Sequence, residues 1–159
     1  MGTNVAPLGE ILTDGEEVLR GLNPKHCEDG LPTEGCFILK ANDTEGPSFG
    51  ILIALPEGQH IAPLGARQGI SPELFLTKLP SPDYGVAQLN VGRAIQEVRT
   101  RGVVFSQTDD ENWGEHRSSH AMLTGYQMLG RRTLNDLKRF LAKLASEGVL
   151  KKAVQKPSI

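Results

Sequence analysis

The stretch TLNDLKRFLAKLASEG, residues 133–148, carries the strongest secondary-structure signal in the sequence. Its apolar residues recur at helical spacing and give one apolar face, made of Leu134, Leu137, Leu141, Leu144 and Ala145. Thr133 is suited to cap the start of a helix, and Gly148 to end it. We therefore expect an amphipathic helix that packs its apolar face on a core.

The chain before this helix contains short apolar runs of strand length, each followed by turn residues. They predict strands at Glu17–Leu22, Cys36–Leu39, Phe49–Leu55 and His120–Tyr126. A further helix is expected from Ser71-Pro72-Glu73 to about Lys78, because a hydroxyl, a proline and a carboxylate in this order are typical of a helix start.

Between these segments, the pattern predicts a strand at Tyr84–Val91, a helix at Gly92–Arg101 and a strand at Val103–Phe105. Strand, helix and strand at this spacing are typical of a crossover unit with parallel pairing. The sequence therefore predicts one α+β domain, a mixed twisted sheet with two or three helices packed on it.

The composition fits a single hydrophobic core. The chain has 159 residues, of which 38% are hydrophobic and 23% are charged, and its formal charge is −2. This balance excludes a disordered chain and a strongly basic nucleic-acid binder. We expect a flexible N-terminal segment at 1–15, the domain at 16–150 and a loose basic tail at 151–159.

The sequence favours a cytoplasmic protein with reduced thiols. No apolar run approaches the roughly 18 residues of a membrane helix, so we expect no membrane association. The first residues lack the basic and apolar regions of a signal peptide. In such a chain Cys27 and Cys36 are expected to be free thiols.

Several familiar kinds of site are disfavoured. His116 and His120 have a metal-binding spacing, but Cys27 and Cys36 are eight residues apart and the histidines lie in a loop, so we expect no metal. Neither glycine-rich phosphate-binding motif occurs, and we expect no cofactor. A cysteine nucleophile at His26-Cys27 is disfavoured because neighbours in an extended segment point apart.

Two charged regions allow a functional and a simpler interpretation. The carboxylates at Asp109–Glu111 beside Trp113 could bind a divalent ion or act as acids, but a solvated loop anchored by the tryptophan fits better. The C-terminal part is basic and could contact nucleic acid, although a solvated helix face is favoured. Its basic residues are Arg131, Arg132, Lys138, Arg139, Lys143, Lys151, Lys152 and Lys156.

Polar residues alternate with turn residues in the first third of the chain. Arg20, Asn23, His26 and Ser48 could line one cleft there. The guanidinium of Arg20 could hold an anion through two parallel hydrogen bonds, or it could simply cap a turn.

The order of short motifs resembles that of a group of short, functionally uncharacterised bacterial proteins. The shared pattern is an early arginine, an Asn-Pro turn, an Asp-Gly-x-Pro-Thr step into an apolar run, a serine at a strand start and a late Ser-His-Ala strand. These motifs are Arg20, Asn23-Pro24, Asp29–Thr33 with Phe37, Pro47–Phe49 and Ser119–Ala121. The resemblance covers most of residues 17–145. It implies that Arg20, Ser48 and His120 share a surface, and it implies no reaction.

The chain is also loosely similar to ADP-ribosyltransferase folds, in which an arginine or histidine and a serine on successive strands hold NAD. Arg20 and Ser48 match in type and order. The chain lacks the Ser-Thr-Ser step and the Gln/Glu-x-Glu step of those enzymes, although Gln96-Glu97 and Asp110-Glu111 supply carboxylates.

We therefore expect a non-enzymatic bacterial interaction module that binds a protein partner or a small anionic ligand. The candidate binding residues are Arg20, Asn23, His26, Ser48 and His120. An NAD-using enzyme and a nucleic-acid adaptor that binds through the basic C-terminal helix remain the alternatives. Convergence of the candidate side chains in one concave pocket would support a ligand site.

Overall fold

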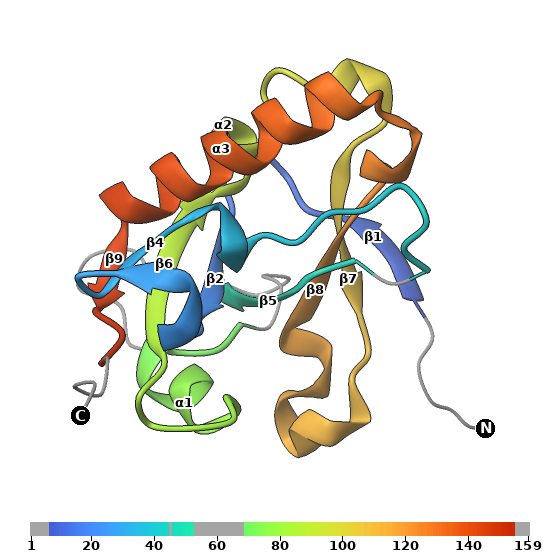
Figure 1. Cartoon of the computed structure of the whole chain (residues 1–159). Helices are drawn as coiled ribbons and strands as arrows, with labels where there is room; N and C mark the ends of the chain where they lie inside the picture. The colour runs from blue at the N-terminus through green and yellow to red at the C-terminus, as the bar shows by residue number, and fades with distance from the viewer. Residues whose placement is uncertain (1–6, 45, 53–68, 155–159) are drawn as a thin grey trace.

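A seven-stranded sheet forms the centre of the molecule (Figure 1). The computed structural model describes residues 7–44, 46–52 and 69–154. The strand order is β1-β7-β8-β5-β2-β6-β9, and a separate pair is β3-β4. The strands are β1 (Pro7–Ile11), β2 (Glu17–Leu22), β3 (Cys27–Glu28), β4 (Leu31–Pro32), β5 (Ser48–Leu52), β6 (Gly85–Asn90), β7 (Val104–Thr108), β8 (His120–Thr124) and β9 (Val149–Lys151).

Helices cover the sheet and short 3-10 turns connect the strands. The α-helices are α1 (Pro72–Thr77), α2 (Val91–Ala94) and α3 (Arg131–Glu147). The 3-10 segments are η1 (Pro24–His26), η2 (Glu34–Cys36), η3 (Arg99–Arg101), η4 (Glu111–Ser119) and η5 (Tyr126–Met128). The predicted single-domain α+β class is thereby confirmed. No helix within the described ranges is both long enough and apolar enough to cross a membrane.

The long helix α3 lies across one side of the sheet, as Figure 1 shows, and its predicted apolar face is buried. Leu141 and Ala145 are fully buried, in one core cluster with the strand residues Val18, Phe49 and Phe105. The helix begins three residues earlier than predicted, because Gly130 and not Thr133 is the N-cap residue. The hydroxyl of Thr133 instead accepts a hydrogen bond from Arg101 at 3.2 Å.

The predicted parallel crossover is wrong. Strand β6 pairs with β2 and β9, whereas β7 pairs with β1 and β8, and all these ladders are antiparallel. Helical structure after β6 is limited to the four residues of α2 and the turn η3. Such short segments do not form the helix that a crossover unit packs on its sheet. Parallel geometry occurs, among the described residues, only at the isolated bridge between Leu52 and Ile70.

The opposite face of the sheet carries a smaller core under α1. Ser71 caps α1 as expected, with its hydroxyl accepting from the backbone of Leu74. Phe75 from α1 packs with Leu19, Val86 and Trp113. The strands below it need glycine, because a Cβ on Gly50 would lie 2.7 Å from the Phe75 ring. The lack of a side chain at Gly50 therefore lets α1 pack close to the sheet.

Both chain ends are more ordered than the sequence suggested. Residues 7–11, assigned to the flexible segment 1–15, form the edge strand β1 and pair with β7. Residues 151–154, assigned to the loose tail, are also fixed: Lys151 pairs with Val86, and Ala153 is buried and donates its N–H to Gly30. Composition alone does not reveal these long-range edge contacts. Residues 1–6 and 155–159 lie outside the described residues.

The apolar run Cys36–Leu39 is not a strand. Cys36 ends the 3-10 turn η2, which Thr33 caps by accepting from the backbone of Gly35. Phe37 and Leu39 are nevertheless buried in the main core. Because Glu34–Cys36 form the turn η2, the run that follows packs as an irregular segment. The end of the predicted strand Phe49–Leu55 lies outside the described residues.

A partly buried hydrogen bond attaches the loop after η2 to the turn after β8. The Tyr126 hydroxyl donates to a carboxylate oxygen of Asp43 at 2.7 Å, and the tyrosine is fully buried. This bond, with the Lys40 backbone N–H, holds the pKa of Asp43 below its ordinary value. Burial and the same bond raise the pKa of Tyr126.

Substitution of Tyr126 by phenylalanine is expected to lower the free energy of unfolding by about 1–2 kcal/mol at neutral pH. The pKa of Asp43 is lower in the folded chain, so its contribution is complete above the unfolded pKa and is lost as pH falls through the folded value. The difference from wild type should shrink in acid. Urea unfolding at about pH 7 and about pH 3 measures both effects. Tyr84→Phe, which removes a hydroxyl without a hydrogen bond in the described structure, is the control; an equal loss in both variants would contradict the assignment.

Candidate functional site

The candidate site lies where two central strands of the sheet part. Strand β2 pairs with β6 along all of Glu17–Leu22, but with β5 only through the pairs from Glu17–Leu52 to Leu19–Gly50. Beyond Leu19 the ladder to β5 ends. An opening in the middle of the sheet leaves backbone groups that need other partners.

Arg20 bridges this opening. Its Nη1 donates to the carbonyl of Ser48 on β5 at 2.8 Å. Its Nε and Nη2 donate to the carbonyl of Cys36 at 3.1 and 2.8 Å. Three of the five N–H groups of a guanidinium are thus used. The side chain joins β2, β5 and η2 at one point.

The Arg20 guanidinium is a charge in a largely apolar setting. Its Cζ lies 5.7 Å from the centre of the Phe37 ring and 5.5 Å from that of Phe49. Burial lowers the pKa of the guanidinium, an effect that interactions with Cys36 and Tyr84 oppose. No carboxylate of the described residues forms an ion pair with it. A permanently charged group held only by carbonyls and rings attracts an anion from solution.

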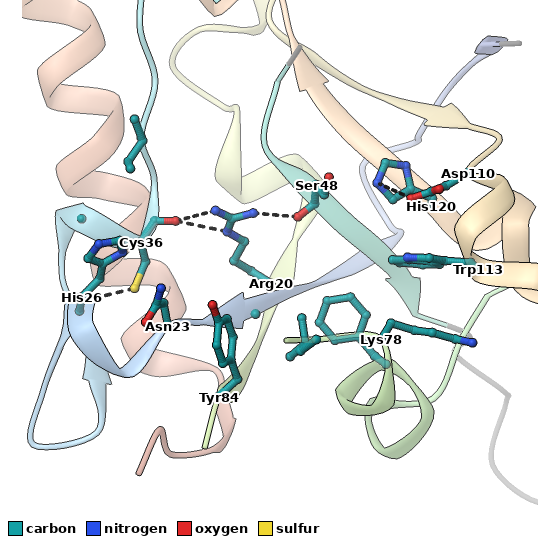
Figure 2. Close-up of a pocket in the computed structure, with 15 residues that line it drawn as sticks. Arg20, Asn23, His26, Cys36, Ser48, Lys78, Tyr84, Asp110, Trp113 and His120 are labelled. Atoms are coloured by element: carbon teal, nitrogen blue, oxygen red, sulfur yellow. Dashed lines mark hydrogen bonds and ion pairs between the residues drawn. The ribbon is translucent and has the colours of Figure 1, made fainter. Parts of the chain in front are cut away.

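A cavity of about 350 Å³ adjoins Arg20, and all five residues singled out from the sequence line it. Arg20, Asn23, His26, Ser48 and His120 come from β2, the turn η1, β5 and β8, yet they share this one hollow (Figure 2). The five residues thus line one cavity, and a hydrogen bond joins Arg20 to Ser48. The volume is within the range of small-molecule sites.

One end of the cavity presents hydrogen-bond donors. Figure 2 shows Asn23, His26 and Tyr84 gathered on the same side of Arg20. The side-chain oxygen Oδ1 of Asn23 caps η1 by accepting a hydrogen bond from the Lys25 backbone N–H. The side-chain nitrogen Nδ2 can therefore donate to another group. The His26 ring and the Tyr84 hydroxyl have no hydrogen bond to described residues.

The other end is aromatic and contains an ionisable pair. His120 is buried, its Nδ1 is hydrogen-bonded to the Thr108 hydroxyl, and its Nε2 lies 3.9 Å from Asp110. The Trp113 ring packs edge-to-face on His120 with ring centres 5.0 Å apart, and on Phe75 with ring centres 5.9 Å apart. These contacts orient the imidazole toward the cavity wall.

An ion pair closes the loop that carries Trp113. Arg117 donates to both carboxylate oxygens of Asp109, at 2.5 and 2.8 Å, and this contact lowers the pKa of Asp109. The Asp110 backbone N–H also donates to the Arg117 carbonyl. The expected loop anchored by tryptophan is present, although most of it is 3-10 helix.

Of the other residues considered in the sequence, Cys36, Asp110 and Trp113 also line the cavity. Of the acidic pairs Gln96-Glu97 and Asp110-Glu111, only Asp110 lines it. His116 lies beside Glu115, with 3.6 Å between Nε2 and Oε1. Neither cysteine is in a disulfide, as expected, and both are buried. In the described ranges no group of three or more His, Cys, Asp or Glu side chains is arranged to hold a metal ion.

The sequence did not single out Lys78 and Tyr84 as site residues. Lys78 is the C-cap residue of α1 and Tyr84 precedes β6, so both read as ends of regular elements. Only the packing of α1 and β6 against β2 brings them to the cavity. No local signal identifies such positions.

Comparison with protein-family models, with curated proteins and with solved structures found no match to this chain.

Proposed function

We propose that this protein binds a small anionic ligand, with a phosphate, sulfate or carboxylate group, in the cavity beside Arg20. The observation that carries this proposal is the Arg20 guanidinium, which is held by carbonyls and phenylalanine rings with no carboxylate partner in the described structure. An oxyanion is the ligand that a guanidinium with unused N–H groups holds best.

The neighbouring groups support an anion at the same end of the cavity. The Asn23 amide, the His26 ring and the Tyr84 hydroxyl can all donate hydrogen bonds, and all line the hollow. Asp110, the carboxylate that lines it, belongs with His120 and Trp113 at the opposite end (Figure 2). An anion beside Arg20 would therefore meet donors, with no carboxylate of the described lining residues at that end of the cavity.

Thermal unfolding of the reduced full chain with a panel of ligands tests the proposal. Phosphate, sulfate, citrate and NAD are compared with chloride at matched ionic strength. An anion at about 100 times its dissociation constant should stabilise the protein by about 2.7 kcal/mol. Asn23→Ala and Tyr84→Phe, which leave the core intact, should weaken binding by about ten-fold, equal to about 1.4 kcal/mol.

Arg139→Met is the matched control, because Arg139 is exposed on α3 and pairs with Asp136. It should bind like wild type. Stabilisation by no anion beyond chloride, or an equal response in Asn23→Ala and Tyr84→Phe, would contradict the proposal. Stabilisation by NAD alone would favour the alternative of an NAD-using enzyme.

A further inference from the structure

Two thiols lie against the wall of the cavity. Cys27 begins β3 and Cys36 ends η2, and both are buried cysteines outside any disulfide. Both thiols lie against the turn η1 and its N-cap residue Asn23, and their side chains influence each other. Each also lies 3.3 Å from a backbone carbonyl, Cys27 from that of Asn23 and Cys36 from that of His26. The two sulfur atoms are therefore neighbours before any oxidation.

Cys36 is part of the anchor of Arg20. Its carbonyl accepts two of the three hydrogen bonds that the guanidinium donates. Cys36 also lines the cavity. Figure 2 shows Cys36 between His26 and Arg20. A displacement of Cys36 would thus move both the anchor and one wall of the site.

We propose that peroxide converts Cys27 and Cys36 into a reversible disulfide, and that this bond weakens anion binding at Arg20. The inference concerns regulation of the same site and so rests on the proposed function. Disulfide formation brings the two sulfur atoms to a bond length of about 2.05 Å. Because η2 carries Cys36, this approach pulls its carbonyl relative to Arg20.

The chemistry balances with hydrogen peroxide as the oxidant. The Cys36 thiolate attacks one oxygen, which gives a sulfenic acid and, with the proton released from the thiol, one water. The Cys27 sulfur then attacks the Cys36 sulfur, the S–S bond forms and a second water leaves. Two thiols are oxidised and one peroxide is reduced, and a dithiol reductant reverses the change.

Cys36 is the attacking thiol and Cys27 the resolving one. Burial raises the pKa of both, that of Cys27 to about 12. For Cys36 the nearby Arg20 charge and two hydrogen bonds act in the opposite direction. Cys36 also lines the cavity, and the lining residues do not include Cys27. Because burial raises the pKa of both thiols, oxidation is expected to be slower than at an exposed thiol.

The test treats the full chain with hydrogen peroxide, blocks remaining thiols under denaturing conditions and measures mass. Folded wild type should lose the mass of two hydrogen atoms and both reactive thiols, and a dithiol should restore them. Cys27→Ser should instead gain oxygen at Cys36. Phosphate affinity, measured by calorimetry before and after oxidation, should fall about ten-fold in wild type and recover on reduction.

The outcomes separate this inference from the proposed function. Phosphate binding by the reduced chain tests the function alone, and disulfide formation is read by mass whether or not phosphate binds. Absence of the disulfide in folded protein, when the unfolded chain forms it under the same conditions, would overturn the inference. So would a disulfide-containing protein that binds phosphate as the reduced protein does. Cys27→Ser, treated identically, controls for oxidation elsewhere.

Discussion

Replacement of Phe49 by alanine is expected to lower the free energy of unfolding by about 3–5 kcal/mol. Phe49 is fully buried, packs edge-to-face on Phe105 with ring centres 5.0 Å apart, and stacks with Phe37 at 6.5 Å. It also lies under the Arg20 guanidinium. The substitution leaves a cavity in the core and removes the Phe49 ring that packs against the Arg20 guanidinium. Chemical denaturation at neutral pH measures the change.

Because such a loss can exceed much of the stability of a small domain, Phe49→Leu provides a second measurement. It should cost about 1–2 kcal/mol and allow the site to be assayed in folded protein. Ile38→Ala is the control, since Ile38 lines the same cavity but is 53% exposed. Its effect should stay within about 0.5 kcal/mol. Equal effects of Phe49→Ala and Ile38→Ala would contradict the packing described.

Replacement of Arg20 by methionine is expected to cost about 2–4 kcal/mol and to abolish stabilisation by phosphate. Methionine keeps an unbranched apolar stem but leaves the carbonyls of Cys36 and Ser48 without the donors that they have in wild type. Strands β2 and β5 would then lose their bridge at the opening. Denaturation and phosphate titration of the same sample give the two results.

Arg139→Met again serves as control, and it should alter stability by no more than about 0.5 kcal/mol because Arg139 is exposed. If Arg20→Met proves too unstable to assay, Arg20→Lys keeps a positive charge without the planar fork, and it should bind phosphate more weakly than wild type. Wild-type stability of Arg20→Met would contradict the bridging role. Wild-type phosphate affinity of either variant would contradict the anion site.

The sequence predicted best those features that local chemistry determines. The apolar spacing of 133–148 gave α3 and its end at Gly148, and Ser71-Pro72 gave the start of α1. The candidate residues Arg20, Asn23, His26, Ser48 and His120 line one cavity, although the sequence left open whether their side chains converge. Four of these lie within thirty residues of one another, on segments that adjoin at the paired strands β2 and β5.

Strand pairing could not be predicted from local patterns. A strand, a short helix and a strand between residues 84 and 105 suggested parallel neighbours, but β6 and β7 lie apart with β2, β5 and β8 between them. Pairing depends on contacts distant in sequence, as does the burial of Ala153 beside Gly30. For the same reason the sequence did not place Tyr84 and Lys78 in the site.

The most direct test of the anion site is a nuclear magnetic resonance titration that follows the Arg20 Nε–H group. This proton donates to the Cys36 carbonyl at 3.1 Å, so it should exchange slowly and give a separate signal. With inorganic phosphate at constant ionic strength, the account predicts that the Arg20 signal shifts and saturates while exposed Arg139 stays unchanged. An Arg20 signal that does not move, or that moves only as Arg139 does, would contradict it.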